Sequence, residues 1–128
     1  MSGRPRILIV DDEAPVLATY QMILEQHGYA VTAVRTTAKA LKVLETGHFR
    51  LILCDLQLES QRSGFEVIAA ARRRDPDISA VLLTGYATGD AIEEAGEKGI
   101  TLVFKPVDIQ EFLPLLDSLV RRPGDNVA

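Results

Sequence analysis

The sequence predicts a single α/β domain in which a parallel five-stranded sheet carries helices on both faces. Short apolar runs alternate with segments whose apolar residues recur at helical spacing, and this alternation occurs five times. The expected strands are apolar at nearly every position, which is typical of a sheet covered on both faces. The chain has 128 residues, close to the roughly 150 residues of one domain.

Each repeat begins with a short, mostly apolar strand. The predicted strands are residues 6–10, 29–34, 49–54, 80–83 and 101–104. After the first strand, apolar residues recur at helical spacing from Val16 to Leu24. Pro15 fits the first turn of this helix, and Gly28 fits the position just past its end.

The second helix lies between the second and third strands. Thr36 or Thr37 is expected to cap its start, and Gly47 to end it. Its predicted apolar face consists of Ala40, Leu41 and Leu44.

The third helix is predicted over residues 65–74, after a loop over residues 56–63. Asp90, with Glu93 three residues later, resembles a capping box for the fourth helix, which Gly99 is expected to end.

The fifth helix has the same capping pattern, in Asp108 and Glu111. Its expected inner face consists of Ile109, Phe112, Leu113, Leu116 and Val120. Polar tails flank a predicted core of about residues 6–121, so residues 1–128 are expected to form one domain.

Composition excludes several classes of protein. The 14 basic and 18 acidic residues give a net charge of −4, which argues against nucleic-acid binding as the main activity. The single cysteine, Cys54, excludes an internal disulfide and a multi-cysteine zinc site. No apolar run approaches the roughly 18 residues that span a bilayer, and the first residues have no signal-peptide core. We therefore expect a cytoplasmic protein without direct nucleic-acid or membrane contacts.

Polar groups follow four of the five strands, whereas Arg35 after the second strand offers no matching group. These polar groups are Asp11, Asp12 and Glu13 after the first strand, then Asp55, Thr84 and Lys105. Ligands of open α/β sheets bind beyond the carboxyl ends of the strands, so we expect these side chains to share one site.

The chemistry of these groups favours phosphoryl transfer. Clustered carboxylates repel one another unless a cation joins them, and Mg²⁺ prefers carboxylate, phosphate and water oxygens. Lys105 supplies a charge, and Thr84 a hydroxyl donor, for phosphate oxygens. One carboxylate remains as a nucleophile that could form an aspartyl-phosphate.

Each group taken alone has a simpler interpretation. Asp11 to Glu13 could cap the first helix, and Asp55 could be an ordinary loop residue. Thr84 begins what could be a plain turn, and Lys105 could be a solvated charge. Their arrival together, each at the end of a strand, favours a shared site.

Four segments together resemble the signature of two-component response-regulator receiver domains. They are VDDE at 10–13, LCDL at 53–56, LTGY at 83–86 and FKP at 104–106. The resemblance extends over about residues 6–120. It implies a flavodoxin-like sheet with strand order 2-1-3-4-5, and a cis peptide bond between Lys105 and Pro106.

The resemblance also implies a role for each site residue. Asp55 would accept a phosphoryl group from a phosphohistidine of a sensor histidine kinase or histidine phosphotransfer protein. Asp12 would bind Mg²⁺ directly and Asp11 partly through water, with Asp55 and the backbone carbonyl of Gln57 as further ligands. Lys105 would pair with the phosphoryl group, and Thr84 would move to hydrogen-bond it.

The sequence departs from the family pattern outside these residues. Leu102 stands where the family usually has an aromatic residue, and Glu59 where a proline is common. The loop to Gly64 is one residue longer than usual, and Pro114 falls inside the fifth helix. Phosphorylation would therefore reach a downstream protein, bound at the face of helix 4, strand 5 and helix 5, through packing changes at Leu102 and Phe104. Alternatively, this face does not switch and the domain passes its phosphoryl group onward in a relay.

Two alternatives remain open on the sequence. A small phosphohydrolase with an aspartate nucleophile is one alternative, but that chemistry favours an Asp-x-Asp pattern after the first strand, where position 13 is Glu, and a late acidic pair, where the fourth strand ends in Thr84. A flavin-binding flavodoxin would need a hydroxyl- and glycine-rich phosphate loop after the first strand, which this sequence lacks.

Overall fold

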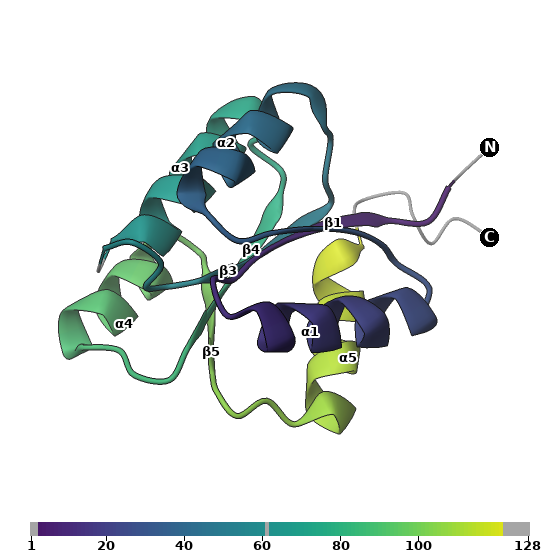
Figure 1. The fold of residues 1–128 in the computed structure, drawn as a ribbon. Coiled ribbons are helices and arrows are strands. Elements are labelled where there is room, and N and C mark those ends of the chain that lie inside the picture. The colour runs from purple at the N-terminus through teal and green to yellow at the C-terminus, as the bar shows by residue number, and fades with distance from the viewer. Residues whose placement is uncertain (1–2, 61, 122–128) are drawn as a thin grey trace.

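A computed structural model describes residues 3–60 and 62–121, in which five strands alternate with five helices (Figure 1). The strands are β1 (Arg6–Val10), β2 (Ala30–Val34), β3 (Leu51–Asp55), β4 (Ser79–Thr84) and β5 (Thr101–Phe104). The helices are α1 (Ala14–Gln26), α2 (Thr37–Thr46), α3 (Ser63–Arg74), α4 (Gly89–Glu97) and α5 (Ile109–Val120). The predicted alternation is confirmed.

The strands form one parallel sheet in the order β2-β1-β3-β4-β5, as the resemblance implied. In the register, Val10 lies beside Cys54, and Asp55 lies beside Leu83. Thr84 in turn lies beside Phe104, the residue before Lys105. The carboxyl ends of β1, β3, β4 and β5 therefore meet at one edge of the sheet.

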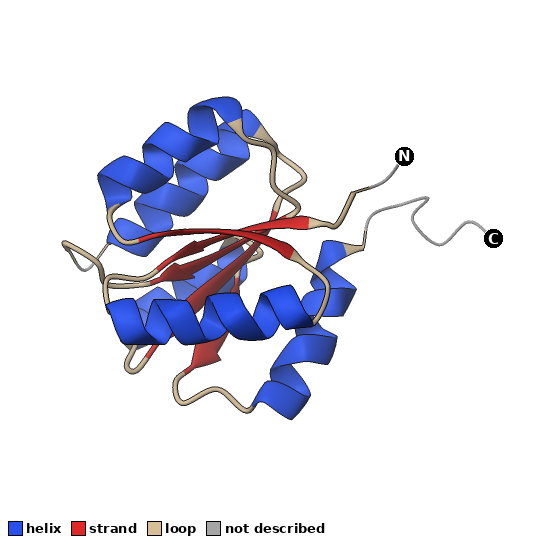
Figure 2. Cartoon of the chain, turned by 45° about the vertical axis from the view of Figure 1, so that its right-hand side comes forward, coloured by secondary structure: helices blue, strands red, loops and turns tan. Residues whose placement is uncertain are grey.

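Helices cover both faces of this sheet, with α1 and α5 on one face and the other three helices opposite (Figure 2). The α1–α5 side buries Leu17, Leu24, Phe112 and Leu116 against the sheet. The opposite side buries six residues of α3, two of α2 and one of α4, Ala95. Nearly every strand residue of the sheet centre is buried, which explains why the strands are continuously apolar.

Most helix-end signals are confirmed. Pro15 lies in the first turn of α1, and Gly28 follows that helix with a φ of 109°, a conformation that favours glycine. Of the two candidates for the cap of α2, Thr36 is the one whose side chain accepts a hydrogen bond, from the Lys39 amide. Asp108 caps α5 by accepting from the Gln110 amide.

Two local predictions were wrong. The cap of α4 is Thr88, whose extended backbone lets its hydroxyl accept from the Ala91 amide, so Asp90 lies inside the first turn. Leu41 is 41% exposed although it was placed on the apolar face of α2, since the contact with the sheet is made by Ala40 and Leu44.

Several element boundaries also differ from the prediction by one or two residues. Strand β3 begins at Leu51 rather than 49 and extends to Asp55, because its ladder pairs Leu51 with Ser79 and Asp55 with Leu83. Helix α3 begins at Ser63, so the loop before it is shorter than predicted. The polar tail after residue 121 lies outside the described residues. Within the described ranges, no helix combines the length and apolar character needed to cross a membrane.

Candidate functional site

Three carboxylates meet at the carboxyl edge of the sheet. Asp11 follows β1 and is completely buried, Asp55 ends β3 with 9% exposure, and Asp12 is exposed. One carboxylate oxygen from each lies within 4.8 Å of the others. They are close because β1 and β3 are neighbours in the sheet and both end here.

Lys105 supplies positive charge to the two buried members of this cluster. Its Nζ atom lies 3.0 Å from Asp11 Oδ2 and 3.3 Å from Asp55 Oδ2. The lysine follows β5, and the peptide bond between it and Pro106 is cis, as the resemblance implied. Its backbone amide donates to the Thr84 carbonyl, 2.8 Å away, so β4 positions the residue as well. Lys105 is therefore a partly buried residue of the site, not a freely solvated charge.

Backbone amides orient the two buried carboxylates. The Glu13 amide donates to Asp11 Oδ1 at 2.9 Å, and the Gln57 amide donates to Asp55 Oδ1 at 3.1 Å. Glu13 is the N-cap residue of α1, but its side chain makes no capping hydrogen bond. The simpler interpretation, in which this acidic run only caps α1, does not account for the burial of Asp11.

Burial and charge together shift the pKa values of the site. Burial raises the pKa of Asp55, with a further rise from Asp11; the Gln57 amide and Lys105 oppose this without cancelling it. Burial lowers the pKa of Lys105, but hydrogen bonds and charges from Asp11 and Asp55 outweigh it, and the net pKa is raised. Lys105 therefore stays charged, and the carboxylates of the site outnumber its one ammonium group, so that their mutual repulsion is only partly offset.

Thr84 ends β4 beside this cluster and is 3% exposed. Its hydroxyl donates to the Tyr86 carbonyl at 2.5 Å and accepts from the Tyr86 amide at 3.2 Å. The hydroxyl is thus bound to the loop that leads to α4. Tyr86 itself is 69% exposed.

Sequence reasoning missed one basic residue of the site. Arg35 was judged to offer no matching group, yet its Nη2 donates to the Asp12 carbonyl at 3.1 Å. Because β2 lies beside β1, a side chain after β2 reaches the loop after β1. The signal in the sequence was a basic residue at the end of the second strand. Its contact with the site could be predicted only once β2 was known to lie beside β1.

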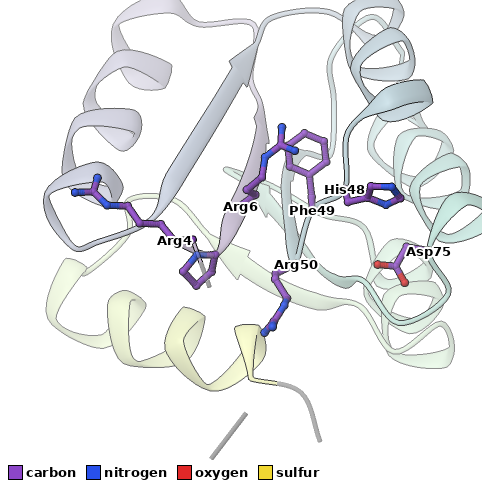
Figure 3. Close-up of a pocket in the computed structure, with 8 residues that line it drawn as sticks. Arg4, Arg6, His48, Phe49, Arg50 and Asp75 are labelled. Carbon is purple, nitrogen blue, oxygen red and sulfur yellow. The ribbon is translucent and has the colours of Figure 1, made fainter. Parts of the chain in front are cut away.

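A cavity of about 350 Å³ lies away from this cluster, at the opposite, amino-terminal edge of the sheet (Figure 3). Three arginines line it, but Figure 3 shows Arg4, Arg6 and Arg50 pointing in different directions. Arg6 lies over the Phe49 ring at 4.8 Å, and Arg50 donates to the Val120 carbonyl at 3.0 Å. The arginines therefore do not converge on a common ligand.

The carboxylate cluster fits a hard divalent cation. Its donors are carboxylate oxygens from three residues, and the single ammonium group of Lys105 contacts two of them, Asp11 and Asp55, which leaves an excess of negative charge. Asp11, Asp12 and Asp55 would supply the ligands. A nucleophilic carboxylate beside a lysine and a hydroxyl is also suited to receiving a phosphoryl group.

Comparison with known proteins agrees with this arrangement. A model of the family described as the response regulator receiver domain matches residues 7–117. The chain is 31% identical over 122 residues to the acid tolerance regulatory protein ActR of Rhizobium meliloti, covering 94% of this chain and 61% of ActR. It is 29% identical over 139 residues to the alginate biosynthesis transcriptional regulatory protein AlgB of Pseudomonas aeruginosa, covering 95% of this chain and 31% of AlgB. The chain thus spans less than two thirds of the length of these curated relatives.

Solved structures share the fold. A CheY-like response regulator receiver domain protein from Methanospirillum hungatei JF-1 has a TM-score of 0.85 at 28% identity, covering 92% of this chain and 94% of that one. The non-phosphorylated HemR receiver domain of Leptospira biflexa has a TM-score of 0.84 at 28% identity, covering 94% and 98%. A response regulator of Burkholderia pseudomallei, described with a phosphorylated aspartic acid, a calcium ion and citrate, has a TM-score of 0.79 at 28% identity, covering 91% and 68%. The phosphohydrolase alternative finds no support in these comparisons.

Proposed function

This chain belongs to the response-regulator receiver family, a family of signalling domains, and from that membership we propose that Asp55 is its phosphoacceptor. The observation that carries this assignment is the contact of Lys105 with both Asp55 and Asp11. This contact brings a carboxylate oxygen of Asp55, a second carboxylate and a positive charge into one cluster, which supports the proposal. We further propose that residues 1–128 act as one receiver domain.

The proposed reaction transfers a phosphoryl group from a phosphohistidine to Asp55. A carboxylate oxygen of Asp55 attacks phosphorus, the new P–O bond forms, the P–N bond breaks, and the imidazole of the donor leaves with the bonding electrons. Lys105 offsets the charge on the phosphoryl oxygens. The Thr84 hydroxyl, now bonded to the Tyr86 carbonyl, would exchange that neutral acceptor for a phosphoryl oxygen.

The acidic cluster is proposed to bind Mg²⁺ through Asp11, Asp12, Asp55 and the backbone carbonyl of Gln57. When bound, Mg²⁺ supplies positive charge that lowers the repulsion between phosphoryl oxygens and carboxylates. The Gln57 amide already holds one oxygen of Asp55, which leaves the second oxygen facing Lys105. The chain's own groups thus orient the carboxylate before the donor arrives. We propose this Mg²⁺-dependent phosphorylation, and the later hydrolysis in which water attacks phosphorus and the P–O bond to Asp55 breaks, as its only chemistry.

The donor would be a sensor histidine kinase or a histidine phosphotransfer protein. A groove of about 480 Å³ adjoins the site and is lined by Tyr20 and Ile23 of α1 and by Lys105, Pro106 and Ile109. Its lining is mostly apolar, which suits a helix that presents its histidine over Lys105. The target would bind at the face of α4, β5 and α5, where Phe104 is 47% exposed. ActR and AlgB are named regulatory proteins, whereas direct nucleic-acid contact is not proposed for this chain.

Intact-mass measurement tests the assignment of the acceptor. The protein is incubated with acetyl phosphate and Mg²⁺, with Asp55→Asn and the exposed Asp77→Asn as matched variants. We expect wild type and Asp77→Asn to gain one phosphoryl group and Asp55→Asn to gain none. Omission of Mg²⁺ should abolish the gain. Equal labelling of Asp55→Asn would refute the proposal.

A further inference from the structure

Helix α4 is held weakly by apolar contacts. The structure describes all nine of its residues, of which Ala95 alone is buried, whereas Ile92 is 47% exposed. Gly89 and Gly96 also lie within it, and glycine lowers the stability of a helix by about 1 kcal/mol relative to alanine. The position of α4 must therefore depend on other interactions.

Two arginines of the α3 segment attach α4 at separate points. Arg62, just before α3, makes a bidentate contact with Glu94, with distances of 2.9 Å and 2.7 Å. Arg72, in the last turn of α3, donates to the carbonyls of Lys98 and Gly99 that follow α4. Figure 1 shows the two helices side by side. Hydrogen bonds from Arg62 and, to a smaller extent, from Lys98 lower the pKa of Glu94 to about 2.

The Arg62–Glu94 contact lies next to the proposed phosphorylation site. Both residues line a cavity of about 270 Å³ together with Gln57, two residues after Asp55, and with Tyr86 and Thr88. One wall of this cavity thus comes from the β3–α3 loop and the other from the β4–α4 loop and α4. The ion pair joins the two walls.

The Thr84 hydroxyl connects the second wall to the site. In this structure it donates to the Tyr86 carbonyl, two residues before the Thr88 cap of α4. If Thr84 turns toward a phosphoryl group on Asp55, that hydrogen bond is lost and the segment leading into α4 is released. The ion pair with Arg62 is then the contact that still holds α4 to the β3–α3 loop.

We propose that the Arg62–Glu94 ion pair is a latch that keeps α4 in its unphosphorylated position and so opposes activation of the domain. This inference rests on the proposed function of Asp55. An interaction made in only one of two conformations shifts the equilibrium toward that conformation. By linkage, it weakens the binding of any ligand that prefers the other conformation. Loss of the latch therefore strengthens binding of a phosphoryl analogue at a site that contains neither residue.

The experiment compares Arg62→Gln with Lys98→Gln. Lys98 contacts the same Glu94 carboxylate at 2.5 Å from within the α4 segment, and its side chain meets α3 at the Phe65 ring, 5.3 Å away, so its loss should loosen α4 from α3 much less than loss of the bidentate ion pair. Binding of beryllofluoride in the presence of Mg²⁺ is measured by titration. Amide hydrogen exchange is measured across residues 89–97 without either ligand.

We expect Arg62→Gln to speed exchange in α4 and to tighten beryllofluoride binding about two- to fivefold, the range for a partly exposed ion pair made in one conformation. Lys98→Gln should speed exchange much less, through loss of the pair within the α4 segment, and should leave beryllofluoride affinity close to that of wild type. Glu94→Gln should match Arg62→Gln, and the double variant should add nothing further.

Three outcomes would overturn the latch: unchanged exchange in Arg62→Gln, unchanged or weaker beryllofluoride binding in it, or equal effects in Lys98→Gln. If wild type itself fails to bind beryllofluoride, the proposed function fails. The exchange in α4 then decides separately whether Arg62 holds the helix.

Discussion

The Nζ atom of Lys105 lies 3.0 Å from Asp11 Oδ2, although 94 positions separate the two residues in the chain. They follow β5 and β1, which have β3 and β4 between them in the sheet. The Lys105 side chain also contacts Asp55, whose Oδ2 atom lies 3.3 Å from the same Nζ atom. The charge balance of the site therefore depends on the order of the strands.

Replacing Lys105 with alanine should weaken the binding of a phosphoryl group. A hydrogen bond to a charged group contributes about 1.5–3 kcal/mol, which corresponds to about 10- to 150-fold in affinity. Titration with beryllofluoride and Mg²⁺ measures the loss. The control is Lys42→Ala, an exposed lysine of α2, which should bind as wild type does. Equal affinities in the two variants would show that Lys105 does not contribute to binding the phosphoryl group.

Asp55→Asn should raise the melting temperature at neutral pH when Mg²⁺ is absent. Burial raises the pKa of Asp55, so its ionised form opposes folding above the folded pKa. The gain should disappear as the pH falls below the unfolded aspartate pKa of about 3.9, because the carboxyl group is then protonated in both states. The melting temperatures of both proteins are measured at about six pH values between pH 3 and 8, with a chelator present.

Asp77→Asn, an exposed aspartate, is the control and should show no such gain. Mg²⁺ should also reduce the advantage of Asp55→Asn, because the ion stabilises only the intact cluster. A variant that is no more stable than wild type in the chelator would contradict the charge excess described for the site.

Gly64→Ala should destabilise the fold and disturb the phosphoacceptor. A Cβ atom there would lie 2.7 Å from the Asp55 carbonyl oxygen and 2.8 Å from Leu56 Cα, both backbone atoms that cannot move aside easily. Overpacking of this kind costs about 1–3 kcal/mol. Gly96→Ala is the matched change, since nothing lies within 4 Å, and it should stabilise α4 by about 0.5–1 kcal/mol. Urea denaturation measures the free energy of unfolding, which should fall in Gly64→Ala and rise in Gly96→Ala. A Gly64→Ala protein as stable as wild type would disprove the close packing.

Tyr29→Phe should lower the free energy of unfolding at pH 7 by about 1 kcal/mol, because the Tyr29 hydroxyl donates to Asp117. Burial and this carboxylate raise the pKa of Tyr29. Its contribution is therefore complete below the unfolded tyrosine pKa of about 10 and is lost as the pH rises further. Urea denaturation at several pH values should show the two proteins converging above that pH. Tyr86→Phe, at an exposed ring, should match wild type throughout.

Much of the candidate site could be predicted because its residues share a local signal. Asp55 and Thr84 end their apolar strands, and Asp11 and Lys105 directly follow theirs, so that these polar residues can be noticed without tertiary information. The structure brings all four to one edge. The contribution of Arg35 could not be predicted in this way, because it acts through a flexible side chain on the carbonyl of a neighbouring loop.

The contacts of α4 show a second limit. Asp90 and Glu93 have the spacing of a capping box, yet Thr88 is the cap, because the loop enters the helix in an extended conformation two residues earlier. Glu94 is an unremarkable acidic residue in the sequence. Only the packing of α3 beside α4 brings Arg62, 32 positions earlier, within 2.7 Å of it.

The sequence by itself determined the five repeats, the kind of each element and the polar residues at the strand ends. These depend on hydrophobic periodicity and on capping within a few residues, which are local properties. The tertiary structure alone decided that Lys105 contacts Asp11 and Asp55, that Arg35 supports Asp12, and that Arg62 holds α4. Those contacts join residues far apart in the chain, so they exist only once the strands have paired in their order and the helices have packed on the sheet.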